Sequence, residues 1–144
     1  MIRKALSIDA NYAMSVSDTS TCAPQSEPAL RVVAMPAFAN PHGDIFGGWL
    51  LSQMDIAGGA VATRLANGRV VTVAITAVTF RRPVFVGDEI SCYTDVVKIG
   101  RTSITLKIRS FSRSAHRDDK VEVTDGVFTY VAVDSKGKPR PDAY

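Results

Sequence analysis

The sequence predicts an α+β fold in which one long central helix is wrapped by a curled antiparallel sheet of about five strands. Residues 47–66 form one long segment of helical composition, and the only charged side chains in it are Asp55 and Arg64. After this segment, every regular stretch is rich in Val, Thr and Ile, which is typical of strands. The connections between these stretches are short, which favours antiparallel pairing, and a helix so apolar has to be buried against one face of the sheet.

The chain has 144 residues, which suits a single domain with a substantial core. Residues 1–28 are rich in Ser, Thr, Ala and Asp and show no helical or strand periodicity, so we expect a flexible N-terminal extension there. We expect the folded domain to span residues 29–135 and a C-terminal tail to span residues 136–144.

The first strand is expected at Leu30–Met35, where a proline ends it, and a loop follows through Asp44. The helix comes next, over residues 47–66, and Asn67-Gly68 closes it. A membrane-spanning helix is disfavoured because Asp55 lies near the middle of this segment.

The rest of the chain predicts four strands, over residues 70–80, 89–99, 102–111 and 121–133. In the third of these, apolar and polar residues alternate, which indicates a strand with one buried face. Gly126 interrupts the last segment and predicts an irregularity there, such as a bulge.

The formal net charge is +3, but residues 98–120 carry seven Lys or Arg against two Asp. This local excess fits either the solvated face of two strands or a site for a phosphate-bearing ligand. Nucleic acid is disfavoured because the segment has one aromatic residue, Phe111, and offers no series of stacking rings.

The two cysteines, Cys22 and Cys92, lie far apart and lack the spacing of a zinc site or a disulfide framework. The N-terminus has no continuous apolar run of the kind that a secretory signal needs. We therefore expect free thiols, no metal site and a cytoplasmic protein.

The segment Asn40–Trp49 places one carboxylate and two glycines directly before the predicted helix. Asp44 either caps the helix or takes part in chemistry. Gly47 and Gly48 fall where the helix begins, so their amides are unpaired within it and face the space at the positive end of the helix dipole. These amides suit an oxyanion, or the glycines merely ease a tight entry into the helix. His42 has no Ser or Cys nucleophile beside it, which favours a loop histidine.

Several short motifs occur in order along the chain: LRVVAMP at 30–36, GDIFGGW at 43–49, SQMD at 52–55, GRVVTV at 68–73, VGD at 86–88, GRTS at 100–103 and VTDGVFTYVAVD at 123–134. In these motifs the sequence resembles the YciA-type acyl-CoA thioesterases, which have the hotdog fold. The resemblance implies hydrolysis of acyl-CoA to CoA and a free acid, without metal or organic cofactor. It also implies dimers whose sheets join edge to edge, often assembled into hexamers as trimers of dimers, with active sites at the dimer interface.

By the same resemblance, Asp44 is the catalytic carboxylate, acting as a general base on water or as a nucleophile that forms an anhydride. Gly47 and Gly48 would then bind the oxyanion. Asp55 is the second carboxylate to consider, because some relatives of this fold use an acidic residue on the helix. Since an unpaired buried charge is costly, we expect Asp55 to orient the site or to meet Arg or Thr side chains across the dimer.

Contacts to the substrate are expected from polar and basic side chains near the turns. Hydroxyl and amide groups would bond water or the pantetheine arm, and guanidinium groups suit the phosphates of CoA. The candidates are Ser52, Gln53, Asp55, Thr72, Arg82, Lys98, Arg101 and Ser103, with Arg81 beside them.

The alternative is a non-catalytic protein of the same fold that binds CoA or acyl-CoA, although the presence of Asp44 with both glycines weighs against it. A hotdog dehydratase acting on acyl carrier protein would need a catalytic His together with an acidic residue on the helix. His42 lies in the loop and not in such a motif.

Overall fold

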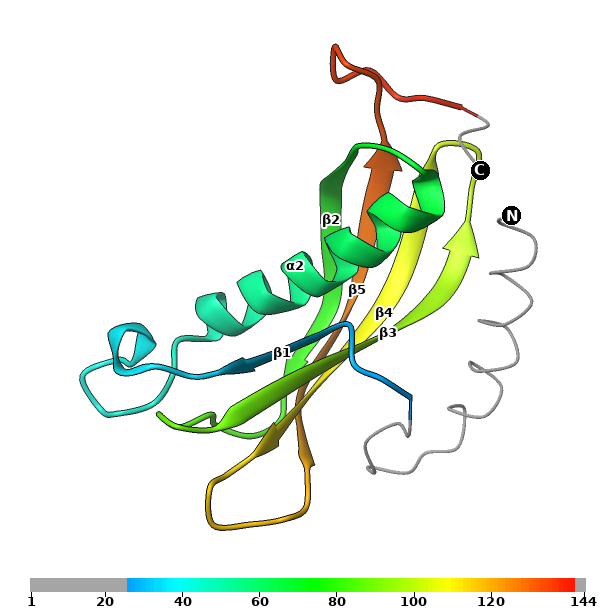
Figure 1. The fold of residues 1–144 in the computed structure, drawn as a ribbon. Helices are drawn as coiled ribbons and strands as arrows, with labels where there is room; N and C mark the ends of the chain where they lie inside the picture. Colours follow the sequence, from blue (N-terminus) through cyan, green and yellow to red (C-terminus); the bar gives the residue numbers. More distant parts are fainter. Residues whose placement is uncertain (1–25, 142–144) are drawn as a thin grey trace.

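The computed structural model describes residues 26–141 (Figure 1). Most of the predicted extension, with Cys22, and the last three residues of the predicted tail lie outside the described residues. The elements are β1 (Leu30–Val33), the short 3₁₀ helix η1 (Pro36–Phe38), α2 (Gly47–Ala66), β2 (Val70–Phe80), β3 (Glu89–Ile99), β4 (Ser103–Arg113) and β5 (Val121–Ala132). This confirms the predicted order of one helix and five strands.

The five strands form one antiparallel sheet in the order β1-β3-β4-β5-β2. β2 follows α2 in the chain yet pairs with the last strand, so β1 and β2 are the two edges of an open sheet. Figure 1 shows α2 lying across the concave face of this curled sheet. The predicted architecture is therefore confirmed.

One side of α2 is buried against the sheet. Its buried residues recur at helical spacing and are Leu50, Met54, Ala57, Gly58, Ala62, Leu65 and Ala66. They pack on the inward side chains of the sheet, among them Ile104, Leu106 and Phe128. The opposite side is open, because Ile56 is 57% exposed. A single chain thus covers only part of a helix that was predicted to be surrounded.

The predicted irregularity at Gly126 lies in the neighbouring strand. Gly126 pairs regularly with Ile108, whereas the pairing of β2 with β5 shifts between Thr76 and Thr79. Ala77, inside this shift, has a φ of 52°, a value that few residues other than glycine adopt. Glycine leaves room for the bulge, since a Cβ at Gly126 would lie 3.3 Å from Val78 Cγ2.

Candidate active site

A cavity of about 380 Å³ opens where α2 begins. Its walls come from the loop before α2, the first turn of the helix, the end of β2 and the segment that follows β2. The lining residues are Asp44, Ile45, Gly47, Leu50, Phe80, Arg81, Arg82, Pro83 and Val84. The fold thus brings four of the residues singled out in the sequence to one cavity: Asp44, Gly47, Arg81 and Arg82.

The loop that carries Asp44 is held by its own backbone and by one side chain. The Oδ1 atom of Asn40 accepts hydrogen bonds from the amides of His42 (2.9 Å) and Asp44 (3.1 Å). The carbonyl of Asp44 accepts a bond from the amide of Asn40 at 2.6 Å, and Ile45 donates to the carbonyl of Val84 at 2.8 Å. The backbone around Asp44 is therefore held by hydrogen bonds to Asn40 and Val84. The carboxylate of Asp44 accepts no hydrogen bond within residues 26–141.

The first amides of α2 are unpaired with protein acceptors. The N-cap residue is Phe46, and no side chain of residues 26–141 caps this end of the helix. The amides of Trp49 and Leu50 donate to the carbonyl of Phe46 at 3.1 and 3.3 Å, but those of Gly47 and Gly48 have no acceptor in the described part of the chain. Asp44 is therefore not the N-cap, and two N–H donors at the positive end of the helix dipole remain available to an anion.

Phe80 packs on the start of the helix, a contact that the sequence alone did not reveal. A Cβ at position 47 would lie 3.1 Å from its ring, so glycine at this position lets the ring and the helix come close together. At Gly48 an added Cβ would meet nothing within 4 Å. The two glycines differ, because only at Gly47 would an added Cβ crowd a neighbouring side chain.

Asp55 lies about two turns further along α2, roughly 12 Å from Gly47 at 1.5 Å per residue. Its Oδ1 atom accepts a hydrogen bond from Thr72 Oγ1 at 2.7 Å and another from the Tyr130 hydroxyl at 3.0 Å. Asp55 was expected to meet a Thr across a dimer, but this threonine belongs to the same chain. Thr72, expected to bind substrate, holds Asp55 in place.

Tyr130 is the partner of Asp55 that sequence reasoning missed. Its side chain is 1% exposed, and its hydroxyl also lies 3.2 Å from the carbonyl oxygen of Asp55. Burial raises the pKa of Tyr130, and the charge and hydrogen bond of Asp55 raise it further. The phenol therefore stays protonated and donates to Asp55. It reaches the helix because Gly58 leaves space, since a Cβ there would lie 2.5 Å from Ile108 Cδ1 and closer still to the phenol oxygen.

The other predicted substrate contacts lie away from the cavity. Ser52 Oγ donates to the carbonyl of Trp49 at 2.6 Å, and Gln53 Nε2 donates to Ser52 Oγ at 3.4 Å. The remaining three candidates flank the turn between β3 and β4 and are Lys98, Arg101 and Ser103. This turn lies at the far end of the sheet, roughly 30 Å from the cavity along an eleven-residue strand.

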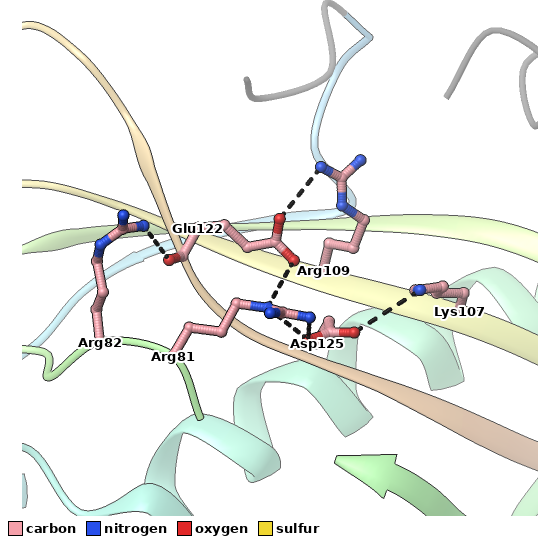
Figure 2. Close-up of polar contacts among 6 residues, drawn as sticks. All are labelled: Arg81, Arg82, Lys107, Arg109, Glu122 and Asp125. Carbon is pink, nitrogen blue, oxygen red and sulfur yellow. Dashed lines mark hydrogen bonds and ion pairs between the residues drawn. The ribbon is translucent and has the colours of Figure 1, made fainter. Parts of the chain in front are cut away.

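The two arginines after β2 differ in what they bind (Figure 2). Arg81 donates to Asp125 Oδ1 from Nε at 3.0 Å, pairs with it from Nη2 at 2.9 Å and lies 3.6 Å from Glu122. Lys107 pairs with Asp125 on its other side at 3.7 Å, and Arg109 with Glu122 at 3.4 Å. Arg81 is therefore part of an ion-pair network on the sheet. Within residues 26–141, by contrast, Arg82 pairs with no carboxylate and donates only to the carbonyl oxygen of Glu122, at 3.1 Å.

Comparison with known protein families shows to which family the chain belongs. The family described as Thioesterase superfamily matches residues 42–114, which include Asp44, α2 and strands β2 to β4. The chain belongs to the thioesterase superfamily. The "Acyl-CoA thioester hydrolase YciA" of Salmonella typhimurium is 50% identical over 121 residues, which cover 82% of this chain and 91% of that protein.

Solved structures of thioesterases share the fold. A hexameric thioesterase from Yersinia pestis is 50% identical, with a TM-score of 0.78 over 83% of this chain and 97% of that one. A hexameric hotdog fold thioesterase of Campylobacter jejuni is 44% identical, with a TM-score of 0.76 over 81% and 90% of the two chains. The predicted family and the predicted hotdog fold are both confirmed.

Residues 26–141 of this thioesterase-superfamily chain contain neither a membrane-spanning helix nor a cluster of metal-ligating side chains. No helix there is long and apolar enough to cross a bilayer. No group of three or more His, Cys, Asp or Glu side chains there is placed to hold a metal ion. The predicted cytoplasmic location stays a prediction.

Proposed function

We propose that the chain hydrolyses acyl-CoA thioesters to CoA and a carboxylic acid. The observation that carries this proposal is the cavity at the start of α2. It is lined by the Asp44 carboxylate and by Gly47, whose amide, like that carboxylate, has no hydrogen-bond partner among the described residues. The relatives named acyl-CoA thioester hydrolases support the choice of a thioester as the substrate.

The thioester carbonyl oxygen would accept hydrogen bonds from the amides of Gly47 and Gly48. These donors stabilise the negative charge that develops when the carbonyl carbon becomes tetrahedral. Asp44 would take a proton from the attacking water, or attack the carbon itself to give an anhydride that water then opens. In both routes the C–S bond breaks, the sulfur of CoA leaves as a thiolate that is then protonated, and the acyl group ends as a carboxylic acid.

Asp55 is a second candidate for the base, and its hydrogen bonds favour it. Thr72 and Tyr130 both bind Oδ1, so the carboxylate is oriented and Oδ2 is left to meet water. A carboxylate held in one orientation is what a general base requires. Since Asp55 lies about 12 Å from Gly47 of its own helix, it would act on a carbonyl held by the helix start of a partner subunit.

The test of the activity is release of free thiol from acetyl-, hexanoyl- and palmitoyl-CoA. We expect hydrolysis of at least one of them. If the chain binds CoA but hydrolyses none of the panel, the non-catalytic alternative is supported and the proposed activity is contradicted.

We also propose that the edge strand β2 pairs with a second copy of the chain. In the described part of the chain, β2 has a strand neighbour on one side only, β5. Beside this edge lie exposed apolar side chains, since Val73 is 53% and Ile56 57% exposed. A long apolar edge strand without a partner is a site for pairing with another chain. The hexameric thioesterases of similar structure support self-association.

Charged residues at this edge should dissociate the assembly. In Ile56→Lys/Val73→Lys, two lysines would be buried without partners in the interface, so we expect the mass measured by light scattering to fall to that of the monomer. The matched control is Val97→Lys, which changes a side chain 59% exposed on β3, away from this edge, and should leave at least the dimer intact. An unchanged mass in the double variant would contradict an interface at β2.

A further inference from the structure

Within residues 26–141, no helix lies over the face of the sheet that is turned away from α2. We call this the outer face; it carries Tyr93, Arg109, Phe111, Glu122 and Asp125. α2 lies on the concave face (Figure 1), and the short helix η1 stacks Phe38 on Trp49 of α2, with ring centroids 5.4 Å apart. Because an uncovered sheet face meets water, the side chains of the outer face should be exposed.

The centre of the outer face is nonetheless closed to water. Phe111 is 0% and Tyr93 3% exposed, and their rings meet edge to face with centroids 5.6 Å apart. Arg109 is buried as well, and its Cζ atom lies 5.0 Å from the centroid of the Phe111 ring. Glu122 and Asp125, members of the ion-pair network in Figure 2, complete this buried set. Since these side chains are buried within one chain, a partner subunit does not account for their burial.

The described residues supply only part of the cover. From the connection between β4 and β5, Lys120 Nζ donates to the Tyr93 hydroxyl at 3.1 Å and lies 5.7 Å from the centroid of that ring. Three residues follow Pro141, and they extend at most about 10 Å. Twenty-five residues precede Ser26. The N-terminal segment is therefore the part of the chain with enough residues to cover the rest of the outer face.

This segment joins the fold beside the buried rings. The amide of Ala29 donates to the carbonyl of Cys92 at 2.9 Å, and Leu30 pairs with Cys92 in the ladder between β1 and β3. Tyr93 is the next residue of β3. Residues 17–25 can span up to roughly 30 Å, at about 3.3–3.6 Å per residue. The residues before them can therefore reach the rings of the outer face.

The first part of the segment is apolar enough to be buried. Of the fifteen residues from Ile2 to Val16, three are charged, Arg3, Lys4 and Asp9. Nine are apolar: Ile2, Ala5, Leu6, Ile8, Ala10, Tyr12, Ala13, Met14 and Val16. Residues 17–25, SDTSTCAPQ, are mostly polar and suit a linker. Packing the apolar side chains against the two rings would remove both surfaces from water, which favours docking.

We propose that residues 2–16 dock on the outer face of their own chain and cover Tyr93, Phe111 and Arg109, with residues 17–25 as the linker. The segment then forms a third layer, on the side of the sheet opposite α2. It also keeps water from the ion pair of Arg109 with Glu122, whose attraction is stronger in a less polar environment. Docking replaces the flexible extension expected from the sequence, and it does not depend on the proposed hydrolysis.

Photocrosslinking of the full chain tests where the segment lies. Tyr12 is replaced by p-benzoylphenylalanine, a ring for a ring, and crosslinked peptides are identified by mass spectrometry. We expect crosslinks to β3 and β4, and we expect them to vanish when the protein is unfolded in urea. A mixture of ordinary and ¹⁵N-labelled protein shows whether both peptides come from one chain. Crosslinks confined to α2, crosslinks between two copies, or no crosslinks would overturn the proposal.

A double-mutant cycle tests the contact with the ring of Phe111. Leu6→Ser/Ile8→Ser/Tyr12→Ser should lower the free energy of unfolding measured in urea, and so should Phe111→Leu. Combined, the two losses should be less than additive, because the segment and the ring are in contact. The matched control is Phe128→Leu, which changes an equally buried ring on the α2 side, and its loss should add fully to that of the segment variant. Full additivity with Phe111→Leu, or no loss from the segment variant, would contradict docking.

Discussion

The double variant Asp44→Asn/Asp55→Asn should lose at least about 100-fold in kcat, because a positioned general base contributes on the order of 10²–10⁴ to rate. The fold should survive. No hydrogen bond to the Asp44 carboxylate is lost, since it accepts none within residues 26–141. At position 55 the amide oxygen of asparagine can still accept the bonds of Thr72 and Tyr130. The measurement is thiol release on the acyl-CoA panel, with circular dichroism and CoA calorimetry as checks on fold and binding.

The single variants show which of the two carboxylates, Asp44 or Asp55, takes part in the reaction. A loss confined to Asp44→Asn supports the carboxylate that lines the cavity with Gly47. A loss confined to Asp55→Asn gives the role to the carboxylate held by Thr72 and Tyr130, and with it the requirement for a partner's helix start. Wild-type turnover in the double variant would remove both from the mechanism.

The secondary structure was predictable because local patterns decided it. The helix spans Gly47–Ala66 as predicted, since its composition leaves no strand alternative and Asn67 ends it with a φ of 50°. All five strands follow the predicted bounds to within two residues, because turn residues separate them. The irregularity predicted at Gly126 is present in the ladder between β2 and β5, but its extra residue lies on β2, which the sequence of β5 does not show.

The site was predictable only in part, because its contacts join residues far apart in the chain. Asp44, Gly47 and Gly48 are neighbours in sequence, so their place at the helix start followed from the motif. The contact of Asp55 with Tyr130 spans 75 residues, and no local pattern indicates it. Arg82 and Arg117 are far apart in the chain yet line one hollow, since β2 and β4 both run antiparallel to β5 and finish at the same end of the sheet.

Gly58→Ala should destabilise the protein, although alanine is the better helix former. Alanine in place of glycine stabilises a helix interior by about 1 kcal/mol. The added methyl group would, however, lie 2.5 Å from Ile108 Cδ1 and closer still to the hydroxyl of Tyr130, both of which are buried. Overpacking a core of this kind costs about 1–3 kcal/mol, and the displaced phenol would also leave Asp55. We therefore expect a lower midpoint in urea unfolding.

Gly59→Ala, one residue further along the same helix, distinguishes the steric effect of the added methyl group from its effect on helix propensity. Its added methyl group would meet only Tyr130 Cε1, at 3.9 Å, an ordinary van der Waals contact. The gain in helix propensity is then unopposed, so this variant should be as stable as the wild type or more stable by up to about 1 kcal/mol. Equal midpoints for Gly58→Ala and Gly59→Ala would show that Tyr130 does not depend on the space beneath Gly58. A fall in kcat for Gly58→Ala at temperatures where it stays folded would link that space, through Tyr130, to the orientation of Asp55.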